Sequence, residues 1–97
     1  VSDARALFEI IGRYPRVRGL LWGHVHQEVD QRCEDLRLLC TPSTCVQFLP
    51  HQIDFAVDTL APGYRWLELT PDGCIETAVS RADGVQFHVD RTANGYL

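Results

Sequence analysis

A chain of 97 residues with 45% hydrophobic and 23% charged side chains has the composition of one compact globular domain, which excludes a disordered tail or a fibrous repeat. Its formal net charge of -4 provides no excess of positive charge to hold a phosphate backbone, so we expect no nucleic acid as partner. The chain has neither the ~18 consecutive apolar residues that span a bilayer nor an opening signal sequence. We therefore expect no membrane partner and a cytoplasmic location.

The first predicted element is an amphipathic helix from Asp3 to Arg13, in which apolar residues recur at helical spacing. Ser2 or Asp3 is placed to cap its start, and Pro15 turns the chain after its end. The run from Val17 to Trp22 is short, apolar at its end and bounded by turn residues, which predicts a buried strand. A helix followed by a buried strand is typical of α/β proteins.

The segments that follow predict hairpins. Glu28 to Cys33 and Leu36 to Cys40 form two short strands around the polar turn Glu34-Asp35, and Val46 to Leu49 adds a short strand. The segment from His51 to Gly63 has no clean period, and we interpret it as a loop.

The clearest hairpin comes late in the chain. The runs 64–69 and 74–79 alternate between apolar and polar residues around the turn Pro71-Asp72-Gly73, which predicts an antiparallel pair. We interpret Trp22 and Trp66 as core anchors. From Arg81 onward the sequence is polar and punctuated by glycine, so 81–97 is expected to be a flexible tail.

Two histidines follow the predicted strand that ends at Trp22, in the run Gly23-His24-Val25-His26. On extended backbone, residues at i and i+2 point to the same side, so both imidazoles would reach into one pocket. The carboxyl end of a strand is where an α/β sheet usually exposes its chemistry. Neutral imidazole is the commonest ligand for zinc, iron and similar ions. The alternative is a pair of ordinary histidines, but the preceding helix and strand favour a metal site.

The run Leu20-Leu21-Trp22-Gly23-His24-Val25-His26-Gln27 resembles the final metal motif, GHxH, of the calcineurin-like metallophosphoesterases. Two later runs resemble more narrowly the bacterial 3',5'-cyclic-AMP phosphodiesterases of class III: Leu39-Cys40-Thr41-Pro42-Ser43-Thr44-Cys45-Val46-Gln47-Phe48 and Asp58-Thr59-Leu60-Ala61-Pro62-Gly63-Tyr64-Arg65. The resemblance implies an α/β (or α+β) fold in which 1–97 is a single partial domain. This would be the carboxy-terminal portion of a four-layer α/β/β/α sandwich, with one helix and about five or six mainly antiparallel strands.

The same resemblance implies hydrolysis of cyclic AMP to AMP by a hydroxide that two metal ions activate, the ions being iron, manganese or zinc. Carried over residue by residue, it implies that His24 binds the second metal and His26 the first, with Gly23 supporting the motif. The other ligand motifs of the family, Asp-x-His, Gly-Asp-x-x-Asp, Gly-Asn-His-Asp/Glu and a lone histidine, would lie upstream of Val1. Because a two-metal site needs a bridging carboxylate, we expect the isolated chain to lack a complete metal site and to be inactive.

Other polar residues receive simpler interpretations. We interpret Glu28, Asp30 and Asp54 as solvated hairpin or loop residues and not as a bridging carboxylate. His51 and His88 have no second ligand at metal spacing, so we expect surface or hydrogen-bonded roles for both.

The cysteines form no C-x-x-C pair, which argues against a zinc finger. Since no signal peptide accompanies them, we expect free thiols in place of disulfides, and we interpret them as ordinary core residues. They are Cys33, Cys40, Cys45 and Cys74.

Two alternatives stay open. The same metal frame in related families acts on nucleotides, other phosphodiesters or phosphoproteins, so the substrate could be another one of these. The chain could instead be a non-catalytic self-association module whose exposed strand edges pair with a second copy. We expect a homo-oligomer, because losing half of a sandwich would expose such edges.

Overall fold

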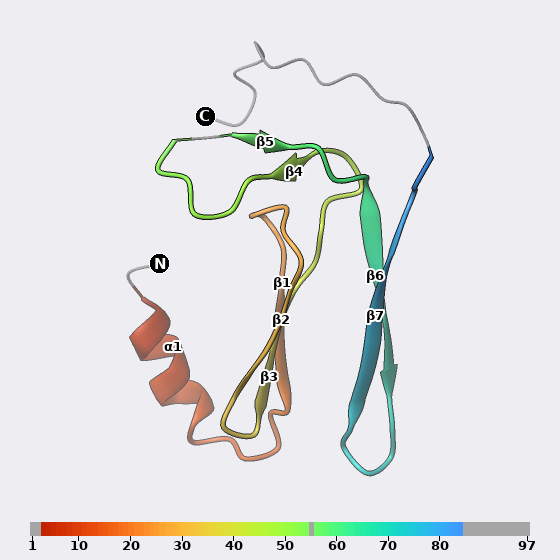
Figure 1. Cartoon of the computed structure of the whole chain (residues 1–97). Coiled ribbons are helices and arrows are strands. Elements are labelled where there is room, and N and C mark those ends of the chain that lie inside the picture. The colour runs from red at the N-terminus through yellow and green to blue at the C-terminus, as the bar shows by residue number, and fades with distance from the viewer. Residues whose placement is uncertain (1–2, 55, 85–97) are drawn as a thin grey trace.

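The computed structural model describes residues 3–54 and 56–84. These residues form one helix and seven strands, mainly antiparallel, which confirms a small α+β fold (Figure 1). The elements are α1 (Ala4–Ile11), β1 (Gly19–Trp22), β2 (Val29–Cys33), β3 (Leu36–Cys40), β4 (Gln47–Phe48), β5 (Val57–Asp58), β6 (Gly63–Leu69) and β7 (Ile75–Arg81). They make a three-stranded sheet of order β1-β3-β2, a pair β4-β5 and a pair β6-β7.

The helix α1 is shorter at both ends than the predicted span. It begins after Asp3, whose backbone oxygen accepts from the N–H of Leu7 at 3.0 Å but whose side chain makes no capping bond. It ends at Ile11, before Gly12. In Figure 1, α1 lies on one side of the three-stranded sheet and the β6-β7 hairpin on the other, so these three layers follow one another across the molecule.

The strand β3 is the centre of the three-stranded sheet. It pairs with β2 in the predicted hairpin, where the turn at Glu34 has a φ of 54°, and it pairs in parallel with β1. Cys40 is the register partner of both Trp22 and Val29, so the carboxyl ends of β1 and β3 meet the start of β2 at one edge. The histidine motif follows directly from that edge.

The predicted loop from His51 to Gly63 contains a short strand. The strand β5 pairs antiparallel with β4, and the N–H of Leu49 extends the pair by donating to the oxygen of Ala56 at 2.9 Å. Two residues per strand are too few to produce a recognisable period, which is why the sequence pattern missed β5. The β4-β5 pair lies across the end of the three-stranded sheet (Figure 1).

The predicted core is only partly correct. Among the described residues Leu39 and Cys40 are buried, with 2% and 0% of their surface exposed, and Pro42 is buried as well. Trp22 and Trp66 are 39% and 45% exposed, so their interpretation as core anchors is wrong for this chain. The prediction that β1 is a buried strand is also wrong. Within the described residues β1 is an edge strand that pairs only with β3, and Leu21 is 53% exposed.

All four cysteines are free thiols, as predicted. Cys40 is buried, and burial raises the pKa of its thiol. The core interpretation is wrong for the other three, which are exposed: Cys33, Cys45 and Cys74.

The expected tail over 81–97 lies mostly outside the described residues, as does His88. Of this segment the structure describes 81–84, and Arg81 is the last residue of β7. The N–H of Ala82 still donates to the oxygen of Pro62 at 2.8 Å. The described part of the hairpin therefore extends beyond the predicted 74–79 strand.

Candidate functional site

The backbone of the histidine motif is not extended, contrary to the prediction. The N–H of Val25 donates to the oxygen of Gly23 at 2.9 Å, which closes a three-residue turn around His24. His24 and His26 have φ values of 75° and 52°, in the left-handed region that non-glycine residues rarely adopt. Such residues cost about 1–3 kcal/mol each and persist where the surrounding structure holds them, often at active sites.

As a consequence, the two imidazoles do not share one pocket. His26 lines a cleft of about 430 Å³, and His24 lines a neighbouring hollow of about 290 Å³. Gln27 and Phe48 line both. The histidine motif thus contributes one ring to each of two adjoining spaces at the end of the sheet.

The imidazole of His26 is fixed from two directions. Its Nδ1 lies 2.9 Å from the backbone oxygen of Val46, and its ring stacks on Phe48 with centroids 4.0 Å apart at 16°. The N–H of Phe48 also donates to the backbone oxygen of His26 at 3.2 Å. Because a carbonyl oxygen only accepts, Nδ1 is the donor in this contact, and in a neutral imidazole the lone pair then belongs to Nε2. Proteins commonly fix a metal-ligating histidine in this way.

The segment that supplies the Val46 carbonyl is itself held by Gln47, whose side chain is 2% exposed. Its Oε1 accepts from the N–H of Ser43 at 3.0 Å, and its Nε2 donates to the oxygen of Ser43 at 2.8 Å. The Ser43 oxygen also accepts from the N–H of Gly63 at 2.9 Å, which ties the segment to the start of β6. Sequence reasoning gave Gln47 no role, because a glutamine in a short strand carries no recognisable signal.

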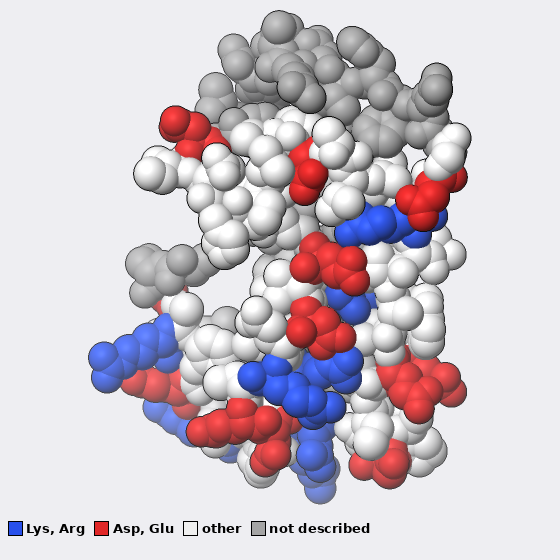
Figure 2. Space-filling model, in the orientation of Figure 1, with Lys and Arg blue, Asp and Glu red and all other residues white. Residues whose placement is uncertain are grey.

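The nearby carboxylates pair with arginines. Glu28 contacts Arg81 at 3.1 Å, and Asp30 receives two hydrogen bonds from Arg37 at 2.7 and 2.8 Å. The Arg37 hydrogen bonds lower the pKa of Asp30. Figure 2 shows one face of the molecule, on which acidic and basic side chains of the described residues lie next to one another. Glu28 and Asp30 are thus engaged in ion pairs.

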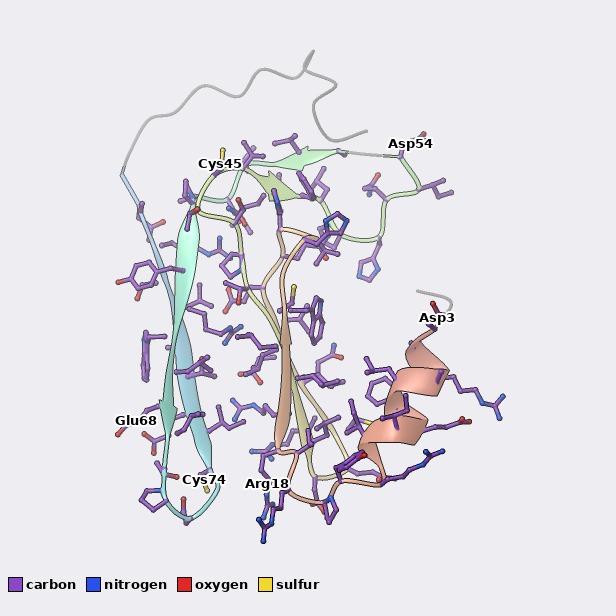
Figure 3. All side chains as sticks on the ribbon, turned by 180° about the vertical axis from the view of Figure 1, so that it is seen from behind. Asp3, Arg18, Cys45, Asp54, Glu68 and Cys74 are labelled. Carbon is purple, nitrogen blue, oxygen red and sulfur yellow. The ribbon has the colours of Figure 1, made fainter. Side chains whose placement is uncertain are left out.

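The remaining predicted residues lie around the two hollows. Asp54 lines the hollow of His24, at the outer end of the loop before β5 (Figure 3). His51 is exposed, as expected, but it also lines the cleft of His26, and the 25 residues between them in the chain hid this proximity from sequence analysis.

Within 3–54 and 56–84, no group of three or more histidines, cysteines and carboxylates could hold a metal ion. The two imidazoles fit a metal centre as nitrogen donors.

No helix in the described part of the chain is both long and apolar enough to cross a membrane. No protein-family model matches the chain, and no solved structure matches it.

Several curated proteins match almost the entire chain. The 3',5'-cyclic adenosine monophosphate phosphodiesterase CpdA of Pseudomonas aeruginosa is 56% identical over 96 residues, which are 99% of this chain and 35% of that protein. The protein of the same name from Escherichia coli K12 is 47% identical over 99% of this chain and 35% of its own length. The 3',5'-cyclic-nucleotide phosphodiesterase alr5338 of Nostoc is 38% identical over 84% of this chain and 30% of its own length.

The chain spans about 35% of the length of the first two relatives. Its predicted resemblance to bacterial cyclic-AMP phosphodiesterases is confirmed by these identities. The chain therefore belongs to the same family as these bacterial phosphodiesterases and corresponds to a carboxy-terminal part of them.

Proposed function

We propose that the full-length protein containing this chain hydrolyses 3',5'-cyclic AMP to AMP. The observation that carries the proposal is the 56% identity, over 99% of this chain, to a protein named for that activity. The Nostoc relative is named for cyclic nucleotides in general, which makes a broader cyclic-nucleotide phosphodiesterase the second candidate.

We propose further that His26 is a ligand of the first metal ion and His24 of the second. When bound, a pair of iron, manganese or zinc ions activates water and neutralises the charge of the phosphate during hydrolysis. The contact of Nδ1 with the Val46 oxygen supports the part of His26 in this assignment, because Nε2 is then the ring nitrogen that we propose to bind the metal. The separate hollows of His24 and His26 support ligation of two different ions.

We propose that the missing ligands, including a bridging carboxylate, belong to a part of the full-length protein outside these 97 residues. Glu28 and Asp30 are less suited to that role, since each is paired with an arginine. We therefore propose that the isolated chain does not hydrolyse cyclic AMP.

We propose that α1, the three-stranded sheet and the β6-β7 hairpin form three of the four layers of a calcineurin-like sandwich. The hairpin supports this arrangement, because Arg65 donates from one of its faces to the sheet while Tyr64 and Trp66 point to the other face. These two aromatic side chains are 58% and 45% exposed. A fourth layer would cover them.

Two further proposals concern the state of the protein. All four cysteines are free thiols, which supports a reducing compartment and hence the cytoplasm.

The 97-residue chain alone is proposed to form a homo-oligomer, because Leu21 and Leu69 expose 53% and 73% of their surface in this chain. Light scattering coupled to size-exclusion chromatography tests this, and a monomer at all concentrations would contradict it.

The function is tested by incubating the full-length protein and Mn²⁺ with cyclic AMP, cyclic GMP and p-nitrophenyl phosphate in parallel. We expect kcat/KM to be highest for cyclic AMP and negligible for the phosphomonoester. Equal rates for both cyclic nucleotides would favour the broader candidate. Turnover of the monoester alone would contradict both.

A further inference from the structure

Gln47 is a buried polar side chain whose entire amide is used by one short segment. Besides its two hydrogen bonds with Ser43, Nε2 donates to the oxygen of Cys45 at 3.3 Å. The N–H of Cys45 donates in turn to Oγ of Ser43 at 2.9 Å. A buried amide that is satisfied at both ends fixes the path of the backbone around it.

The residues on either side of Gln47 both hold His26. Val46 presents its carbonyl oxygen to Nδ1 at 2.9 Å, and Phe48 stacks on the ring and donates its N–H to the backbone of His26. Since Gln47 stands between them in the chain, its amide determines where the carbonyl and the aromatic ring lie.

This support matters because His26 needs to be held. Its φ of 52° is disfavoured for a residue with a Cβ, so the conformation depends on neighbours that compensate for it. A free imidazole can also carry its proton on either nitrogen. The Val46 carbonyl selects the form with the proton on Nδ1.

We propose that Gln47 is a positioning residue for His26: by fixing the 43–47 segment, its amide keeps the Val46 carbonyl in place and the imidazole lone pair on Nε2. This inference rests on the proposed function, because it takes His26 to be a metal ligand. Gln47 itself contacts neither the metal nor the substrate in this scheme. A merely structural role for Gln47 would affect folding but not the position of the ring proton.

The test uses the full-length protein with ¹⁵N-labelled histidine and with its metal removed by a chelator. Long-range proton–nitrogen NMR spectra report which ring nitrogen of His26 carries the proton, and the His26→Ala variant identifies the signals. Titration with Mn²⁺ then gives the metal affinity. The variant Gln47→Met keeps the volume of the side chain and removes the amide, while Thr44→Ala changes an exposed side chain of the same segment and is the matched control.

In the parent protein we expect the proton of His26 on Nδ1. In Gln47→Met we expect signals of the form protonated on Nε2 and a Mn²⁺ affinity lowered about 10–100-fold, as is typical when the partner of a metal ligand is lost. Thr44→Ala should change neither. The proposal requires both changes in Gln47→Met, so the absence of either one overturns it.

Two controls keep the outcomes separate. If Gln47→Met does not fold by circular dichroism, Gln47→Glu takes its place, because it retains the acceptor for Ser43 but loses both donors. A parent protein with the His26 proton on Nε2 overturns the positioning role without any variant. An unchanged Mn²⁺ affinity in His26→Ala instead overturns the ligand assignment on which the inference rests.

Discussion

Arg65 donates from Nη2 to the backbone oxygen of Cys40 at 3.0 Å, which joins the β6-β7 hairpin to the end of the three-stranded sheet. The same nitrogen lies 3.1 Å from the oxygen of Val29, the register partner of Cys40. At the other end of the sheet, Arg37 of β3 donates from Nη1 to the backbone oxygen of Ile75 in the hairpin at 2.9 Å. The histidine motif starts one residue beyond Trp22, which also pairs with Cys40. The hairpin therefore braces the edge of the sheet that presents the motif.

Replacing Arg65 by methionine should destabilise the protein by about 1.5–3 kcal/mol, because two carbonyl oxygens at the joined edge lose a charged donor. Urea unfolding of the full-length protein at neutral pH measures this change. Arg32→Met is the matched control, since Arg32 is exposed on β2 and should have an effect within about 0.5 kcal/mol of zero. Equal midpoints for the two variants would show that the hairpin is not held through Arg65.

Gly63→Ala should destabilise by about 1–3 kcal/mol through overpacking. A Cβ at this position, the buried first residue of β6, would lie 3.1 Å from the oxygen of Ser80 and 3.2 Å from Cγ of Pro42. Gly12→Ala provides the comparison, because Gly12 has a helical φ of -59° and its nearest contact would be 3.4 Å. Thermal unfolding of both variants checks the prediction, and a loss of stability in Gly12→Ala alone contradicts it.

The Asp30–Arg37 pair should make stability depend on pH at the acidic end. The Arg37 hydrogen bonds lower the pKa of Asp30 in the folded protein, so the pair stabilises above the ordinary value of 3.8 and loses its effect as pH falls through the folded pKa. The Asp30 side chain is 41% exposed, which limits the contribution to about 1 kcal/mol or less.

Asp30→Asn should therefore lose stability at neutral pH and converge with the parent protein only once the pH has fallen below the ordinary pKa of 3.8 and through the lowered folded pKa. Urea unfolding at several pH values measures the difference between them. Asp35→Asn removes an exposed carboxyl group of the turn between β2 and β3 that makes no ion pair within the described residues. This control should run parallel to the parent. A constant gap between Asp30→Asn and the parent at all pH values would refute the linkage.

The sequence predicted those elements whose pattern is local. The hairpins around Glu34 and Gly73 were predicted because alternation and turn residues are short-range signals, and their antiparallel pairing is confirmed. Burial could not be predicted in the same way. Trp22 and Trp66 have the composition of core residues, but their exposure depends on which layers cover the sheets.

The site shows the same limit. The histidine spacing indicated the motif, but not its left-handed backbone at His24 and His26. The contacts that hold His26 come from Val46 and Phe48, about 20 residues away in the chain, and a local pattern does not show them. The role of Gln47 was hidden for the same reason, as its partners define a turn and not a pattern. Resemblance identified the motif as a whole, and physical contacts explain how its second histidine is held.

The most direct test of the central claim is cyclic-AMP hydrolysis by the full-length protein with Mn²⁺, with bound metal determined on the same samples, for the parent, His24→Ala, His26→Ala and Thr44→Ala. The account predicts turnover and bound metal in the parent and in Thr44→Ala. It predicts a loss of kcat of about 100-fold or more, with reduced metal content, in both histidine variants. Turnover and metal content that are unchanged in the histidine variants, or a parent protein that does not hydrolyse cyclic AMP, would contradict it.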